Sequence, residues 1–115
     1  MWRTVLDSLK QFSSWRGRRY KVQIGESHVA EAEVAEWTVY VVRYGAHDKW
    51  AYLRCPCPAH DVIRLNLSAS QRPRWTVRAG GDRIADIDPS IWQHDGCRSH
   101  FIIRDGRVRW VRGIR

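Results

Sequence analysis

Two closely spaced pairs of metal-type ligands constrain the fold of this chain more than any other feature. The first is Cys55-Pro56-Cys57 and the second is Cys97-Arg98-Ser99-His100, and together they contain all three cysteines of the chain. Turn-forming residues accompany both pairs, Pro56 and Pro58 in one and Asp95-Gly96 in the other. A metal needs ligands that converge from at least two segments. The sequence therefore predicts two metal-binding turns held against each other.

The donor atoms indicate which metal these turns would hold. Three thiolates and one imidazole suit tetrahedral Zn²⁺, and four protein ligands leave no open position, which indicates a structural rather than a catalytic site. A [2Fe–2S] cluster stays open as an alternative, because Rieske proteins use a similar pattern with a histidine where Cys57 stands here. The predicted ligands are Cys55, Cys57, Cys97 and His100, with His60 and His94 as substitute ligands.

The remainder of the chain predicts a mainly β fold. Runs of β-branched and aromatic residues are separated by turns about every 8–12 residues, which is typical of antiparallel sheets. Asp105-Gly106 between two alternating runs is a strong hairpin signal. We expect a small antiparallel β-sandwich or barrel-like domain with two metal-knuckle turns and one N-terminal helix. The expected strands are 37–44, 50–54, 62–67, 74–78, 83–87, 99–104 and 107–111.

The length of 115 residues predicts a single zinc-binding domain over residues 1–115. Apolar residues recur at helical spacing near the start and predict a helix over residues 2–13. A basic connector at 14–21 follows, and the β-rich core is expected over 37–111. The pattern at 22–36 fits either a short helix or an edge strand.

The formal net charge is +8, with 20 basic and 12 acidic residues, and the excess lies at the two ends of the chain. Arg107 and Arg109 are two residues apart on an expected strand, so they share one face, which Val111 continues. This charge suits a polyanion or an acidic partner, or else a solvated surface. The candidate contact residues are Arg16, Arg18, Arg19, Lys21, Trp92, Arg98, Arg107 and Arg109.

The expected location is the cytoplasm. The chain has no run of about 18 apolar residues and no signal-peptide pattern, so we expect no membrane association. An odd number of cysteines argues against a disulfide framework and fits a reducing compartment.

The sequence assigns no catalytic residue. Ser99 and His100 are adjacent, and adjacent strand residues face opposite sides of a sheet, so they do not form a dyad. A histidine that binds a metal is also unavailable as a general base. Asp86 and Asp88 are explained by the turn toward Pro89 at least as well as by a paired-carboxylate site. A non-catalytic role is favoured, although enzyme activity stays open.

Four segments of the chain carry a family resemblance, namely 55–57, 88–92, 97–103 and 108–110. Together they resemble an uncharacterised bacterial family, domain of unknown function 6527. The resemblance implies a small zinc-binding β-rich domain. It also implies an accessory role beside bacterial ubiquitin-like proteins and the enzymes that activate, conjugate or deconjugate them. Members often continue with Gly-Cys-Gly after the Cys-x-Cys pair, whereas this chain has Pro58-Ala59-His60.

These observations favour a non-catalytic, zinc-stabilised binding or adaptor module, accessory to a bacterial ubiquitin-like conjugation system. The expected partner is then a protein of that pathway. An electron-transfer or redox-sensing protein with a [2Fe–2S] cluster on the same ligands is one alternative. A nucleic-acid-binding zinc protein that uses the basic ends is the other.

Overall fold

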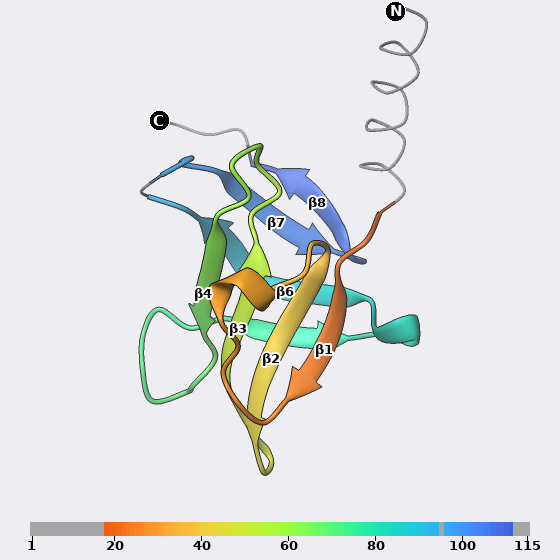
Figure 1. Ribbon diagram of the computed structural model, residues 1–115, viewed down its shortest axis with the longest axis vertical. Coiled ribbons are helices and arrows are strands. Elements are labelled where there is room, and N and C mark those ends of the chain that lie inside the picture. Colours follow the sequence, from red (N-terminus) through yellow and green to blue (C-terminus); the bar gives the residue numbers. More distant parts are fainter. Residues whose placement is uncertain (1–17, 95, 112–115) are drawn as a thin grey trace, which may run out of the picture.

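The computed structural model describes residues 18–94 and 96–111. The helix expected at 2–13 and the first part of the basic connector lie outside these residues. In the described part, eight strands form two four-stranded sheets (Figure 1). The elements are β1 (Lys21–Gly25), η1 (Glu31–Glu33), β2 (Thr38–Tyr44), β3 (His47–Arg54), β4 (Val62–Asn66), β5 (Thr76–Ala79), η2 (Gly81–Arg83), β6 (Ala85–Trp92), β7 (His100–Arg104) and β8 (Arg107–Trp110), where η marks a short 3₁₀ turn.

The first sheet has the order β1-β2-β3-β4. The ambiguous stretch at 22–36 forms most of edge strand β1 and the turn η1, and β1 begins at Lys21, within the expected connector. The strand β1 pairs with β2 in parallel, with Lys21 opposite Thr38, whereas the other pairs in this sheet are antiparallel. The chain between β1 and β2 crosses back to the start of β2, which makes this parallel pairing feasible.

The second sheet, β5-β6-β7-β8, is antiparallel throughout. Its strand β6 runs to Trp92, well past the expected end at residue 87. Pro89 in the middle of the run argued against a continuous strand, because proline has no N–H to donate. The structure places Pro89 in an irregularity. The pairing shifts from Ile87 opposite Ile103 to Ile91 opposite Phe101, so β6 has the longer segment between these two pairs.

The core lies between the two sheets. Val39, Val41 and Leu53 from the first sheet join Ile87 and Phe101 from the second in one cluster of buried side chains. The strands β4 and β7 alternate between buried and more exposed residues, as expected when one face packs inward. The expected mainly β, antiparallel-rich fold is confirmed. The two sheets remain separate and do not close into a barrel.

The predicted hairpin at Asp105-Gly106 is also confirmed. Asp105 and Gly106 have φ values of 52° and 72°, and they join β7 to β8. A Cβ at Gly106 would lie 2.7 Å from Cβ of Arg19, so only glycine fits without displacement. No helix in the described residues is long and apolar enough to cross a membrane.

Candidate active site and thiol cluster

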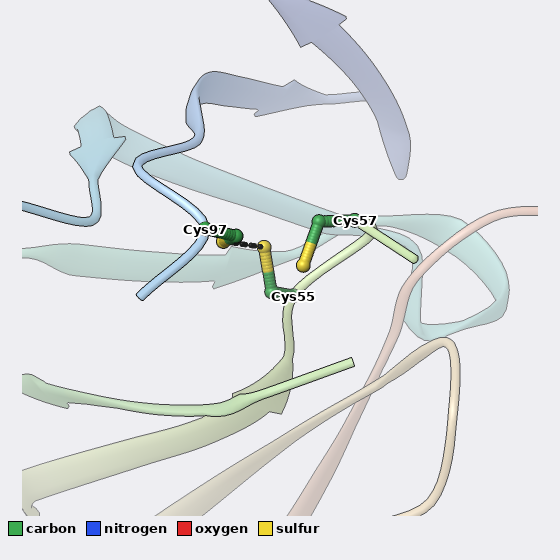
Figure 2. A group of neighbouring side chains, drawn as sticks. All are labelled: Cys55, Cys57 and Cys97. Carbon is green, nitrogen blue, oxygen red and sulfur yellow. Dashed lines mark hydrogen bonds between the residues drawn. The ribbon is translucent and has the colours of Figure 1, made fainter. Parts of the chain in front are cut away.

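The structure brings the three cysteines together. Cys55 and Cys57 lie on the turn after β3, and Cys97 lies on the loop between β6 and β7. Figure 2 shows their sulfur atoms converging from these two segments. All three sulfur atoms lie within 4.8 Å of one another, and the Cys55 and Cys97 Sγ atoms are 3.5 Å apart. The two turns singled out in the sequence therefore meet.

This spacing fits thiolate ligands of a tetrahedral metal. With Zn–S bonds of about 2.3 Å, two thiolates on one Zn²⁺ are separated by about 3.8 Å. Sulfur atoms in this arrangement could move onto a metal with small adjustments. In residues 18–94 and 96–111, no fourth histidine, cysteine or carboxylate atom joins the three sulfurs at this spacing. The group can hold a metal ion but is incomplete as a four-ligand site.

Local hydrogen bonds fix both turns. The Cys55 N–H donates to the Asp61 carbonyl at 2.7 Å, and the His60 N–H donates to the Cys57 carbonyl at 3.1 Å. On the other side, the Ser99 hydroxyl donates to the Cys97 sulfur at 3.1 Å. These contacts shape the two turns without any metal.

The thiols differ in their electrostatic environment. Burial raises the pKa of the Cys55 thiol to about 12, because the charged thiolate loses hydration there. Burial also acts to raise the pKa of Cys97, but hydrogen bonds from Ser99 and Cys57 outweigh it and lower that pKa below its ordinary value. A cation at this point would favour the thiolate form of each ligand.

The expected ligand His100 does not join the cysteines in the structure, and neither do the substitute ligands His60 and His94. His60 is exposed, with Nε2 at 4.0 Å from the Glu36 carboxylate. His94 is exposed and stacks on Trp92, with ring centroids 4.6 Å apart. His100 lies on β7 and directs Nε2 to a serine hydroxyl.

That serine is Ser90. Its Oγ lies 2.9 Å from His100 Nε2, across the neighbouring strands β6 and β7. Both side chains are partly buried, so the pair lies at the surface of the second sheet with some access to solvent. A hydroxyl in contact with a neutral imidazole can lose its proton to the ring as it attacks an electrophile. This Ser–His pair is absent from the sequence-based predictions.

Two tryptophans support the pair. The Trp75 indole N–H donates to the Ser90 carbonyl at 3.2 Å, which holds the backbone of the serine. Trp92 lies opposite His100 in the strand register, and their rings stack with centroids 4.9 Å apart and planes 6° apart. Trp92 is 46% exposed, with one partner of its ring being the imidazole of His100. Its ring restricts the orientation of the imidazole.

The neighbouring aspartates do not form a paired acid–base site. Asp88 forms ion pairs with Arg78, at 3.0 Å, and with Arg104. Asp86 accepts the Asp105 backbone N–H at 2.7 Å and thereby shapes the β7–β8 hairpin. Both carboxylates have structural partners.

The candidate contact residues are distributed over several surfaces. Arg16 lies outside the described residues, Arg18 is exposed, and Arg19 lies 3.9 Å from the Asp105 carboxylate. Lys21 is exposed on β1, and Arg98 is exposed on the loop that carries Cys97. The structure places Arg107 and Arg109, both exposed on β8, and Trp92 in the same sheet as the Ser–His pair.

Sequence reasoning missed the Ser90–His100 pair because it considered only the adjacent Ser99. Residues on two strands meet according to the pairing register, and the irregularity around Pro89 shifts that register. The ten-residue separation of serine and histidine carries no signal by itself.

Comparison with known proteins gives one match. A family model described as "Bacterial ubiquitination-like system serine protease (BubE)" matches residues 26–111, well over half of the chain. No curated protein and no solved structure matches the chain. This match confirms the expected link to a bacterial ubiquitin-like system. The matching family model carries another name than domain of unknown function 6527, the family expected from the sequence. The chain therefore belongs to the BubE family of bacterial ubiquitination-like systems.

Proposed function

We propose that this chain is a serine peptidase of a bacterial ubiquitination-like system, with Ser90 as nucleophile and His100 as general base. The observation that carries this proposal is the 2.9 Å contact between Ser90 Oγ and His100 Nε2. The description of the matching family as a serine protease supports it. The proposal replaces the non-catalytic role that the sequence favoured.

The reaction follows from the roles of the two side chains. Ser90 Oγ adds to the carbonyl carbon of a peptide bond as its proton passes to His100 Nε2. His100 then gives that proton to the leaving amine, and the amide C–N bond breaks to leave an acyl-serine. A water molecule, deprotonated by the same imidazole, hydrolyses this ester and restores the Ser90 hydroxyl. Trp92 would keep the imidazole plane in place through both steps.

We further propose Zn²⁺ as the resident metal of the three thiols. The sulfur spacing supports a metal site, and the donor set suits zinc. Its role would be structural, because it would bind the Cys55–Cys57 turn to the loop that leads from Cys97 to His100. A [2Fe–2S] cluster is the alternative occupant, and visible absorption together with iron and zinc analysis of the purified protein distinguishes the two.

The proposed peptidase and the ligand set expected from the sequence assign different roles to His100. If the imidazole is the general base, His100→Ala should abolish reactivity while one metal ion per chain remains. If it is the fourth metal ligand, as expected from the sequence, the same substitution should lower the metal content. Metal analysis of this variant beside Cys97→Ser therefore separates a base from a ligand.

A non-catalytic adaptor is the second candidate. The observation in its favour is that, in the described part of the chain, no carboxylate is bonded to His100, so the pair lacks the third group that orients the base in many serine peptidases. In this case the same surface would bind a pathway protein without cleaving it.

A fluorophosphonate probe tests the proposed peptidase, because it reacts with activated serine hydroxyls and needs no known substrate. We expect one adduct per chain on Ser90, detected by intact mass and peptide mapping. Ser90→Ala should abolish it, and His100→Gln should slow it by about 10²–10⁴-fold. Ser27→Ala, which removes an exposed hydroxyl from the loop after β1, is the matched control and should label normally. Unlabelled wild-type protein with a full complement of metal would favour the adaptor.

A further inference from the structure

The outward face of the second sheet combines the Ser–His pair with exposed apolar and basic side chains. On β7, Phe101 and Ile103 are buried, so the alternating residues His100 and Ile102 point away from the core. Trp92 lies opposite His100 on one side. On the other side the Val111 N–H donates to the His100 carbonyl at 2.9 Å, so Val111 continues the same row. We call Ser90, Trp92, His100, Ile102, Arg107, Arg109 and Val111 the dyad face.

One arginine on this face, Arg109, lies close to the reacting atoms, and Arg107 lies farther along β8. Arg109 is paired with Ile102, which is two residues from His100 along β7. A strand rises about 3.3 Å per residue and neighbouring strands are about 4.8 Å apart, so the Cα atoms of Arg109 and His100 are separated by about 8 Å. An extended substrate would cover that distance with two or three residues. Arg109 therefore lies within reach of side chains close to the scissile bond.

The positive charge of this region is not balanced within the described residues. Arg104 is paired with Asp88, but no ion pair involves Arg107 or Arg109 in residues 18–94 and 96–111. Arg107 lies directly opposite Arg104, whose charge Asp88 already offsets. Arg107 and Arg109 are therefore the cations of this face that a bound anion could neutralise.

The apolar part indicates the kind of anion. Trp92 is 46% exposed and Val111 is 37% exposed, and they flank His100 in one row. An extended polypeptide can place apolar side chains on this row and carboxylates over the arginines. A nucleic acid would use the arginines but has little to match Val111.

We infer that the dyad face is the substrate-docking surface and that it selects polypeptides with acidic residues within about three positions of the scissile bond. This inference rests on the proposed peptidase function, and it adds the class of substrate. Arg109 would contact the carboxylate nearest the scissile bond, Arg107 one farther along the peptide, and Trp92 and Val111 the apolar neighbours.

The test separates docking from chemistry. Two fluorescent peptides of equal length share a central pair of leucines, which glutamates flank in one peptide and lysines flank in the other. Ser90→Ala protein is titrated into each peptide at low salt, and binding is followed by fluorescence anisotropy. We expect the glutamate peptide to bind at least about tenfold more tightly, with an affinity that falls as salt is added. Combining Arg107→Glu with Arg109→Glu should reverse that preference. Lys49→Glu, on β3 of the other sheet, should leave it within about twofold.

Lys49→Glu in protein that retains Ser90 should react with the small neutral fluorophosphonate at the wild-type rate, because this residue lies on the other sheet, away from the dyad face. Equal binding of the two peptides, binding of neither, or no effect of the double substitution would overturn the inference. Tighter binding of single-stranded DNA than of the glutamate peptide through the same arginines would overturn it in favour of a nucleic-acid surface. Failure of Ser90 to label in the wild type would refute the peptidase proposal alone, because the anisotropy result does not depend on it.

Discussion

Replacing Cys97 with serine gives a quantitative test of the thiol cluster. The substitution changes one sulfur to oxygen and preserves the shape of the side chain, and Cys97 is only partly buried. In a protein without metal, such a change should lower the free energy of unfolding by about 1 kcal/mol or less. The effect in a metal-bound protein should be far larger.

The larger value follows from the number of ligands. Structural zinc sites supply about 10–16 kcal/mol of apparent binding free energy, so an equal share for one of the four positions of a tetrahedral zinc, three of which the thiols would hold, is about 2.5–4 kcal/mol. For a domain of this size each kcal/mol corresponds to a shift of about 4 °C in Tm. Cys97→Ser should therefore lower Tm by about 10–16 °C if the metal is bound, and by less than about 4 °C if it is not.

Thermal unfolding of wild-type and variant protein, each with and without a chelator, measures both values. The four melting curves form a cycle in which the chelator removes the metal and the substitution removes a ligand. We expect the substitution to matter mainly without chelator and the chelator to matter mainly in the wild type. Equal Tm shifts in both conditions, or a full complement of zinc in the variant, would refute the assignment of Cys97 as a ligand.

Three further predictions concern acidity, the stacked tryptophan and the core. Metal binding displaces the proton of Cys55, whose pKa is raised to about 12, so zinc affinity should fall by at least about 100-fold from pH 8 to pH 6, as measured by competition with a chelating dye. The metal-free protein should instead lose stability as the pH rises from about 9 toward 12, because its folded state favours the neutral thiol. Trp92→Ala should slow fluorophosphonate labelling of Ser90 and lower the free energy of unfolding by only about 0.5–1.5 kcal/mol, whereas Trp92→Phe should retain most of the labelling rate. A large loss of stability with rapid metal release would show instead that the ring covers the thiol cluster. Phe101→Ala should lower unfolding free energy by about 3–5 kcal/mol in urea titrations, because the ring is fully buried between the sheets, and a loss below 1 kcal/mol would contradict the described core.

The mainly β fold was predictable because its signals are local. The hairpin depends on the left-handed backbone that Asp105 and Gly106 adopt readily, so two residues decide it. Strands such as β2 and β4 follow from residue composition and alternation over a few positions. The meeting of Cys55, Cys57 and Cys97 was predictable from residue type, since these are the three cysteines of the chain and a metal needs ligands from more than one segment.

The tertiary structure decided features that depend on register and on distant pairing. The parallel pairing of β1 with β2 depends on the path of the intervening chain, which no local pattern specifies. The extension of β6 beyond Pro89 depends on an irregularity that accommodates a residue without an N–H.

The Ser90–His100 pair shows most clearly what the sequence by itself did not determine. In the sequence, His100 follows Cys97 by three residues, and this spacing suggested a metal ligand. The cross-strand register placed the imidazole next to a serine instead, with Nε2 at 2.9 Å from the hydroxyl. Because a shift of one residue moves a side chain to the opposite face of a sheet, the chemistry of this surface is decided by strand pairing, whereas the thiol cluster is largely encoded by the spacing of its residues.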